Sequence, residues 1–166
     1  NNAHSILQFC ESKQLIQRLE THIEQMKSAL PEERYYVYLA SVYTYRLALN
    51  KNQLMKYAKI IYNHVERAME LNPNDPFVLS MQGNVEFYSP FGSKKTALGY
   101  FQRADSLYAI SGTDYERWNR RAVQMTYILC LNKQRKKDQA IALCERLLAE
   151  EPNNVNFQQL LEQLHA

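Results

Sequence analysis

The chain has 166 residues, a length that fits one domain able to bury roughly 70% of the surface its unfolded chain would expose. Its 46% hydrophobic and 22% charged residues are typical of a globular protein, and four glycines with five prolines are too few for the turns of an all-β fold. The formal net charge of +3 requires no nucleic-acid or membrane partner, and no apolar run approaches the ~20 residues of a membrane-spanning helix.

The first half of the chain is predicted to form three helices. Apolar residues at helical spacing cover about residues 4–29, and this helix ends because Pro31 disfavours helical backbone in the residue before it. Pro31 followed by two acids is a favourable helix start, so a second helix continues to about Leu49. Residues 50–52 form a turn into a third helix, which ends at Leu71.

Five further helices are predicted in the second half. Residues 72–76 supply a capping residue and a proline that suits the first turn of the next helix. The first three of these helices cover about residues 77–88, 94–110 and 115–131. The fourth ends near residue 150, and the fifth is short and ends at about residue 164. The predicted fold class is therefore all-α, with about eight helices.

A short apolar pattern recurs in three of these helices, with steps of four and then three residues. Its copies are Ile61, Val65 and Ala68, then Ala97, Phe101 and Ala104, and then Ala140, Cys144 and Leu147. These steps place the side chains of each copy on one face of a helix. A repeated helix hairpin cannot bury that face alone, so we expect antiparallel helix pairs to stack into a right-handed α-solenoid.

The segment from Asn72 through Gly83, followed by Ala97, Phe101 and Ala104, resembles a tetratricopeptide repeat. That family forms hairpins of ~34 residues, with a small residue where the two helices cross and an Ala–aromatic–Ala ladder on the second helix. Gly83 stands at the crossing position, and the turn at residues 90–92 is an insertion relative to the family pattern. The resemblance implies a single repeat domain over residues 1–166, made of an N-terminal capping helix (1–30), three degenerate hairpins (33–152) and a C-terminal capping helix (154–165).

The run of residues 87–92, together with residues 97–101, also resembles a subgroup of bacterial cell-envelope tetratricopeptide proteins of unsettled function. In that subgroup the turn between the paired helices is extended and rich in glycine. The likeness implies a periplasmic or cell-envelope location rather than a cytoplasmic one. The sequence starts at Asn1 rather than at methionine, as it would after removal of a secretory signal or after trimming.

The sequence contains no pattern typical of an enzyme. No pair of the four histidines has the spacing of metal ligands, and there is neither a glycine-rich phosphate loop nor a serine in a nucleophile elbow. We therefore expect a non-catalytic protein with no metal and no cofactor. Cys130 and Cys144 are interpreted as buried free thiols. The basic residues within 117–121 and 133–137 are interpreted as solubilising surface, since ~15 residues of helix separate them and nucleic acid needs a continuous stripe.

Candidate binding residues lie on the predicted second and fourth helices. Arg46 and Asn50 are four residues apart, and Asn84 occupies the matching place two helices later. The family resemblance implies that such residues clamp the terminal carboxylate of a bound peptide on the concave face. Tyr43 and Tyr88 are expected to line the same face as rigid amphipathic contacts.

Three functions are compatible with this sequence. The preferred one is a protein–protein interaction scaffold that holds a peptide or a partner segment in its concave face. The first alternative is a small-ligand or solute-binding helical domain of the cell envelope, with a cavity lined by tyrosines. The second is a self-assembly module, a homo-oligomer formed through the first helix. The identity of the partner is not encoded in any recognisable motif.

Overall fold

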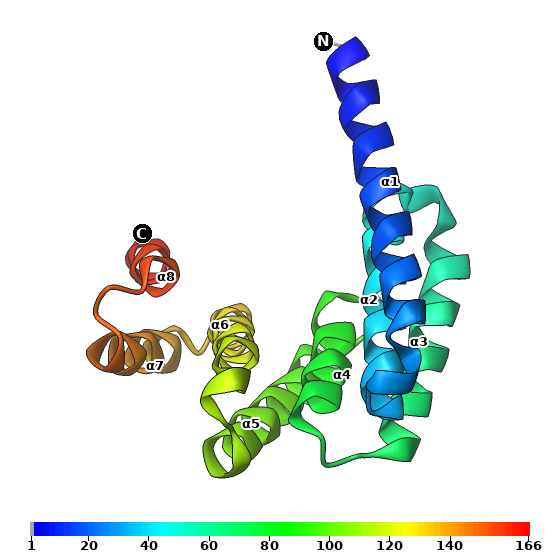
Figure 1. The fold of residues 1–166 in the computed structure, drawn as a ribbon. Coiled ribbons are helices and arrows are strands. Elements are labelled where there is room, and N and C mark those ends of the chain that lie inside the picture. The colour runs from blue at the N-terminus through cyan, green and yellow to red at the C-terminus, as the bar shows by residue number, and fades with distance from the viewer. Residues whose placement is uncertain (1) are drawn as a thin grey trace. The chain divides into compact units, whose positions relative to one another are not determined.

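The computed structural model describes residues 2–166, and the side chains of all of these except residues 2–4 and 7. The described residues form eight α-helices and three short 3-10 helices, with no strand among them (Figure 1). The α-helices are α1 (Asn2–Gln25), α2 (Glu32–Leu49), α3 (Leu54–Leu71), α4 (Pro76–Tyr88), α5 (Lys94–Ser111), α6 (Arg117–Lys133), α7 (Lys137–Glu150) and α8 (Val155–His165). The all-α class and the eight predicted helices are confirmed.

Two predicted helix boundaries differ from the structure, one by four residues and the other by two. The first helix ends at Gln25, and residues Lys27–Ala29 form a 3-10 helix before Leu30 becomes extended ahead of Pro31. The sixth helix begins at Arg117, because Asp114–Glu116 also form a 3-10 turn. Tightening of the terminal turn is common at helix ends and cannot be seen in apolar periodicity.

The chain divides into two compact units, Asn1–Pro73 and Asn74–Ala166. Each unit is described by itself below. The single repeat domain expected over residues 1–166 stays a prediction. No helix in the described part of the chain is long and apolar enough to cross a bilayer.

The first unit packs α2 against both α1 and α3. Its core cluster contains Ile23 from α1 and three residues from α2, namely Tyr35, Leu39 and Val42. On α3, the first copy of the recurring pattern is buried as expected, at Ile61, Val65 and Ala68. The first turns of α1 project beyond the α2–α3 turn (Figure 1).

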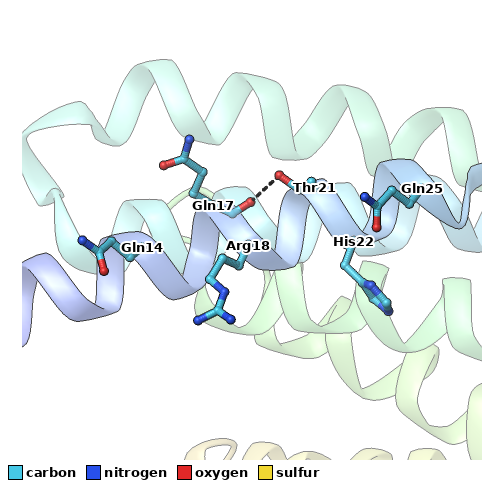
Figure 2. Close-up of a pocket in the computed structure, with 6 residues that line it drawn as sticks. All are labelled: Gln14, Gln17, Arg18, Thr21, His22 and Gln25. Atoms are coloured by element: carbon cyan, nitrogen blue, oxygen red, sulfur yellow. Dashed lines mark hydrogen bonds between the residues drawn. The ribbon is translucent and has the colours of Figure 1, made fainter.

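A stripe of exposed polar side chains follows α1. The stripe borders an open hollow of about 480 Å³ and consists of Gln14, Gln17, Arg18, Thr21, His22 and Gln25, all from α1 (Figure 2). The Thr21 hydroxyl donates to the Gln17 carbonyl of its own helix at 3.0 Å. The spacing of three and four residues is that of an ordinary solvated helix face.

The second unit begins with a close crossing of α4 and α5. Ala97, Phe101 and Ala104 are fully buried, so the predicted ladder is confirmed. A Cβ atom at Gly83 would lie 2.6 Å from Cε1 of Phe101. Glycine is therefore needed at this position because the aromatic ring of α5 lies directly against the backbone of α4.

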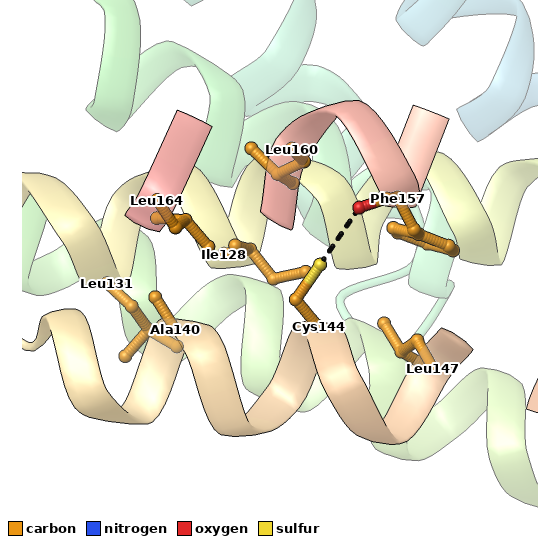
Figure 3. Close-up of a cluster of buried hydrophobic side chains, with 8 residues drawn as sticks. All are labelled: Ile128, Leu131, Ala140, Cys144, Leu147, Phe157, Leu160 and Leu164. Atoms are coloured by element: carbon orange, nitrogen blue, oxygen red, sulfur yellow. Dashed lines mark hydrogen bonds between the residues drawn. The ribbon is translucent and has the colours of Figure 1, made fainter. Parts of the chain in front are cut away.

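The last three helices share a second core in this unit (Figure 3). It contains Ile128 and Leu131 from α6, Ala140, Cys144 and Leu147 from α7, and Phe157, Leu160 and Leu164 from α8. The Cys144 thiol donates to the Phe157 carbonyl at 3.3 Å, and the Cys130 thiol donates to the Lys94 carbonyl at the same distance. Both cysteines are free and buried as predicted, and burial raises the pKa of each thiol.

Candidate functional site

Three of the five predicted binding residues lie together at the end of α2. Tyr43 and Arg46 occupy the last two turns of the helix, and Asn50 caps it by donating its backbone N–H to the Arg46 carbonyl at 3.0 Å. The Arg46 guanidinium carbon lies 4.9 Å from the centre of the Tyr43 ring, which is a cation–π distance. The ring thereby helps to hold the guanidinium in one orientation.

Arg46 and Asn50 border a cavity of about 280 Å³ between α1, the end of α2 and the start of α3, called here the α1–α2 groove. Its wall combines charged, amide and apolar side chains: Phe9, Lys13, Ile16, Gln17, Glu20, Arg46, Leu49, Asn50 and Tyr57. The Tyr57 ring lies 5.9 Å from the Tyr43 ring, so Tyr43 packs behind the cavity wall. A pocket with one apolar side and two nearby cations can hold both the side chain and the charge of a peptide residue.

An internal acid already engages the Arg46 guanidinium. Nη1 of Arg46 donates to Oε1 of Glu20 at 3.3 Å, and Nη2 of Arg46 donates to Oε2 of Glu20, so the ion pair is bidentate. The two side chains are only 27% and 28% exposed. The carboxylate of Glu20 therefore occupies the position on Arg46 that the family resemblance assigned to the carboxylate of a peptide.

Glu20 is a site residue that sequence reasoning missed. It lies on the face of α1 that packs against α2, four residues after Ile16 and three before Ile23. An acid within an apolar stripe is the signal that could have revealed it. Such an acid needs a cationic partner on the facing helix.

The tyrosines of α2 are mainly packing residues rather than groove residues. The Tyr35 hydroxyl donates to Oε1 of Glu24 at 2.6 Å, and burial, followed by this bond, raises the pKa of Tyr35 to about 12. The rings of Tyr36 and Tyr43 contact the His64 ring at 5.8 and 6.0 Å between centres. Burial lowers the pKa of His64, so this aromatic cluster between α2 and α3 favours neutral imidazole.

The other two predicted residues, Asn84 and Tyr88, lie on α4 of the second unit. Asn84 is half-buried, whereas Tyr88 is exposed and packs its ring edge-on against Phe87 at 4.7 Å. The structure thus brings together Tyr43, Arg46 and Asn50 within the first unit. The clamp that also includes Asn84 stays a prediction.

A hydrogen-bonded turn follows Tyr88 and presents another exposed ring, that of Phe91. The Gly92 N–H donates to the Ser89 carbonyl at 3.1 Å, and the Ser93 N–H donates to Oε2 of Glu86 at 2.7 Å. A Cβ at Gly92 would lie 2.2 Å from the Glu86 carbonyl oxygen, so this turn also requires glycine. The inserted turn is therefore fixed at both ends.

A second charged cavity, also of about 280 Å³, lies where α5 turns into α6. There Arg121 donates to Glu151 at 2.9 Å, and Arg117 donates to the same carboxylate through Nε at 2.9 Å. Bonds from Arg121, Asn154 and Arg117, in that order, lower the pKa of Glu151 to about 2. The interpretation of these arginines as simple solubilising surface was wrong for Arg121, which is largely buried in this network.

Neither cavity contains a constellation typical of metal or nucleophilic chemistry. No group of three metal-ligating side chains occurs among the residues that the structure describes. No protein-family model, curated protein or solved structure matches the chain significantly. Function is therefore inferred from the chemistry and geometry of this chain alone.

Proposed function

We propose that this protein is a protein–protein interaction scaffold, without catalytic activity, whose first unit binds a peptide segment of a partner in the α1–α2 groove. The observation that supports this is the composition of the groove wall, where Arg46, Asn50 and Lys13 face the same cavity as apolar side chains. The cavity volume of about 280 Å³ falls at the lower edge of the ~300–1,000 Å³ usual for small-molecule sites. A volume of this size suits one or two peptide side chains better than a solute.

The ligand chemistry we propose is a carboxylate next to an apolar side chain. The carboxylate competes with Glu20 for the guanidinium of Arg46, which the Tyr43 ring holds from behind. The Asn50 amide supplies further donors at the rim, and the Phe9 and Ile16 side chains supply apolar contact. A partner's chain terminus or an acidic side chain provides such a group.

We also propose that the helix pairs form a right-handed tetratricopeptide-like solenoid. The close contact of Gly83 with Phe101, and the burial of Ala97 and Ala104, support this, since the family pattern places small residues at these points. The long inserted turn after Tyr88 makes the hairpin of α4 and α5 longer than the ~34-residue family repeat.

A peptide-display selection followed by calorimetry tests the proposal. Peptides selected on the full chain should lose affinity by about tenfold or more in the Arg46→Ala variant, because a charge-assisted bond contributes ~1.5–3 kcal/mol. Glu20→Gln should bind the same peptides more tightly, since the competing carboxylate is removed. Arg67→Ala is the matched control, because its guanidinium pairs with Glu70 and Glu32 outside the groove. Equal affinities for Arg46→Ala and Arg67→Ala would refute the assignment of the groove.

A further inference from the structure

The second unit carries different chemistry at its two ends. The Cys130 thiol contacts the Lys94 carbonyl, so the end of α6 lies beside the start of α5. At the other end, the Nε of Arg120 donates to Asp105 of α5 at 2.9 Å, and Arg121 donates to Glu151 just after α7. The 17 residues of α6 span about 25 Å, and this length separates the two ends.

One end is strongly basic. This basic end comprises the start of α5 and the α6–α7 turn, and its exposed cations are Lys94, Lys95, Lys133, Arg135, Lys136 and Lys137. None of these six side chains has an ion pair within the described part of the chain. Two acids lie beside them, Asp138 in the sequence and Glu86, whose Oε2 accepts the Ser93 N–H at 2.7 Å, so the six cations remain in excess. The basic end is therefore a surface whose charge the unit itself does not neutralise.

The opposite end exposes large apolar side chains. Ile110, Tyr115 and Trp118, which we call the aromatic corner, are 84%, 92% and 83% exposed. Ile110 is in the last turn of α5, while Tyr115 and Trp118 are three residues apart across the start of α6. Exposed tryptophan and tyrosine close to a charged cavity are characteristic of interaction hot spots.

The charge around the aromatic corner is opposite to that of the basic end. Three arginines (117, 120 and 121) face five carboxylates, those of Asp105, Asp114, Glu116, Glu150 and Glu151. Internal bonds to Asp105, Glu150 and Glu151 engage Arg120 and Arg121, and Arg117 also bonds Glu151. The corner thus combines exposed aromatic rings with an excess of negative charge.

We propose that the protein associates with a second copy of itself head to tail, with the basic end of one copy on the aromatic corner of the next. Charge complementarity selects this occupant, because the lysine and arginine side chains of the basic end meet a surface with more carboxylates than cations and lie over the faces of Trp118 and Tyr115. Within one copy the two ends are about 25 Å apart on the same helix, so they cannot meet. The contact is heterologous, and it extends into short chains of copies rather than closing as a two-fold dimer. This association is independent of the α1–α2 groove.

The chain supplies its own reporter for this contact, since Trp118 is its single tryptophan. Emission of the full-length protein should shift to shorter wavelength as its concentration rises from about 1 to about 300 µM, because association removes the indole from water. Sedimentation velocity on the same samples should show species larger than a monomer. Both effects should weaken when NaCl is raised from about 50 to about 500 mM, because exposed charges are screened.

Two variants break the contact from opposite sides. Lys136→Glu with Lys137→Glu alters the basic end, and Ile110→Ser with Tyr115→Ser alters the aromatic corner while it keeps the reporter. Each should lower the association constant by at least about tenfold. When the two variants are mixed, the intact corner of the first meets the intact basic end of the second, and we expect a one-to-one complex with no larger species.

A charge change away from both ends is the control. Lys51→Glu with Lys59→Glu alters two exposed lysines of the first unit and should leave association unchanged. Far-UV circular dichroism and melting curves should match wild type in every variant, because all the changed side chains are exposed. An emission maximum independent of concentration would overturn the proposal. So would association that the basic-end variant leaves intact, or a mixture that does not form the one-to-one complex.

Discussion

Replacing Gly83 with alanine tests the crossing of α4 and α5. The added Cβ would lie 2.6 Å from Cε1 and 2.8 Å from Cδ1 of Phe101, well inside van der Waals contact. Phe101 is fully buried, and the Phe87 ring packs edge-on to it at 6.4 Å, so the ring has little room to move. Overpacking costs about 1–3 kcal/mol, whereas alanine in a helix gains about 1 kcal/mol over glycine. We expect Gly83→Ala to lower the free energy of unfolding by about 1 kcal/mol, with an upper bound of about 2 kcal/mol.

Gly99 provides a matched control on α5. A Cβ at Gly99 would meet no atom within 4 Å, and the residue is exposed within the helix. Gly99→Ala should therefore raise the free energy of unfolding by about 0.5–1 kcal/mol. The two substitutions are chemically identical. If urea unfolding followed by circular dichroism shows that they change the free energy of unfolding in opposite directions, the difference is due to the contact with Phe101.

A stabilising effect of Gly83→Ala would refute this reasoning, because it would mean that the helices do not cross closely at this point. A second comparison separates the clash from other effects of the substitution. In a Phe101→Leu background the added methyl group meets a smaller side chain, and the cost of Gly83→Ala should decrease.

Three further predictions concern the two units. Phe101→Ala should cost about 3–5 kcal/mol in the same unfolding assay, and a loss below about 1 kcal/mol would contradict its complete burial. The pKa of Glu151 is lowered from 4.5 to about 2, so its ion pairs stabilise the fold above about pH 4.5 and lose that effect as pH falls towards 2. Melting temperature should therefore fall more steeply over this interval in wild type than in Glu151→Gln, and parallel curves would argue against the network. Removing residues 1–30 uncovers Tyr35 and Leu39 and should cause dimerisation or aggregation in size-exclusion chromatography, whereas a monomer with unchanged melting temperature would show that α1 is an independent arm.

Local signals explain why the helices could be predicted from the sequence. Pro31 and Pro76 set helix starts through their fixed backbone angle, and Asp75 caps α4 by accepting the Phe77 N–H at 2.9 Å. The recurring steps of four and three residues also identified the buried face of α3, α5 and α7. The pattern did not identify the next core residue of α5, which is Tyr108: Leu107, three residues after Ala104, is only half-buried, whereas Tyr108, four residues after it, is buried.

The site was harder to predict because its contacts join distant residues. Glu20 and Arg46 are 26 positions apart, and their pairing depends on the rotation of α1 against α2, which apolar spacing determines only loosely. Arg121 and Glu151 are 30 positions apart, and each reads in the sequence as an ordinary surface charge. The exposure of Trp118 could not be predicted from the sequence either, because a large aromatic residue near a helix start usually packs inward.

If the α1–α2 groove binds a carboxylate as proposed, the Glu20–Arg46 pair also limits which acids can enter it. A tethered carboxylate acts as a competitor at millimolar or higher effective concentration, and it never diffuses away. Simple metabolites that offer a carboxylate alone face this competitor at every encounter and gain nothing else from the cavity. A segment that also places an apolar side chain beside Phe9 and Ile16 has a second source of affinity. Under the proposed function, the internal acid would therefore disfavour ligands that offer only a carboxylate and favour peptide segments that also offer an apolar side chain.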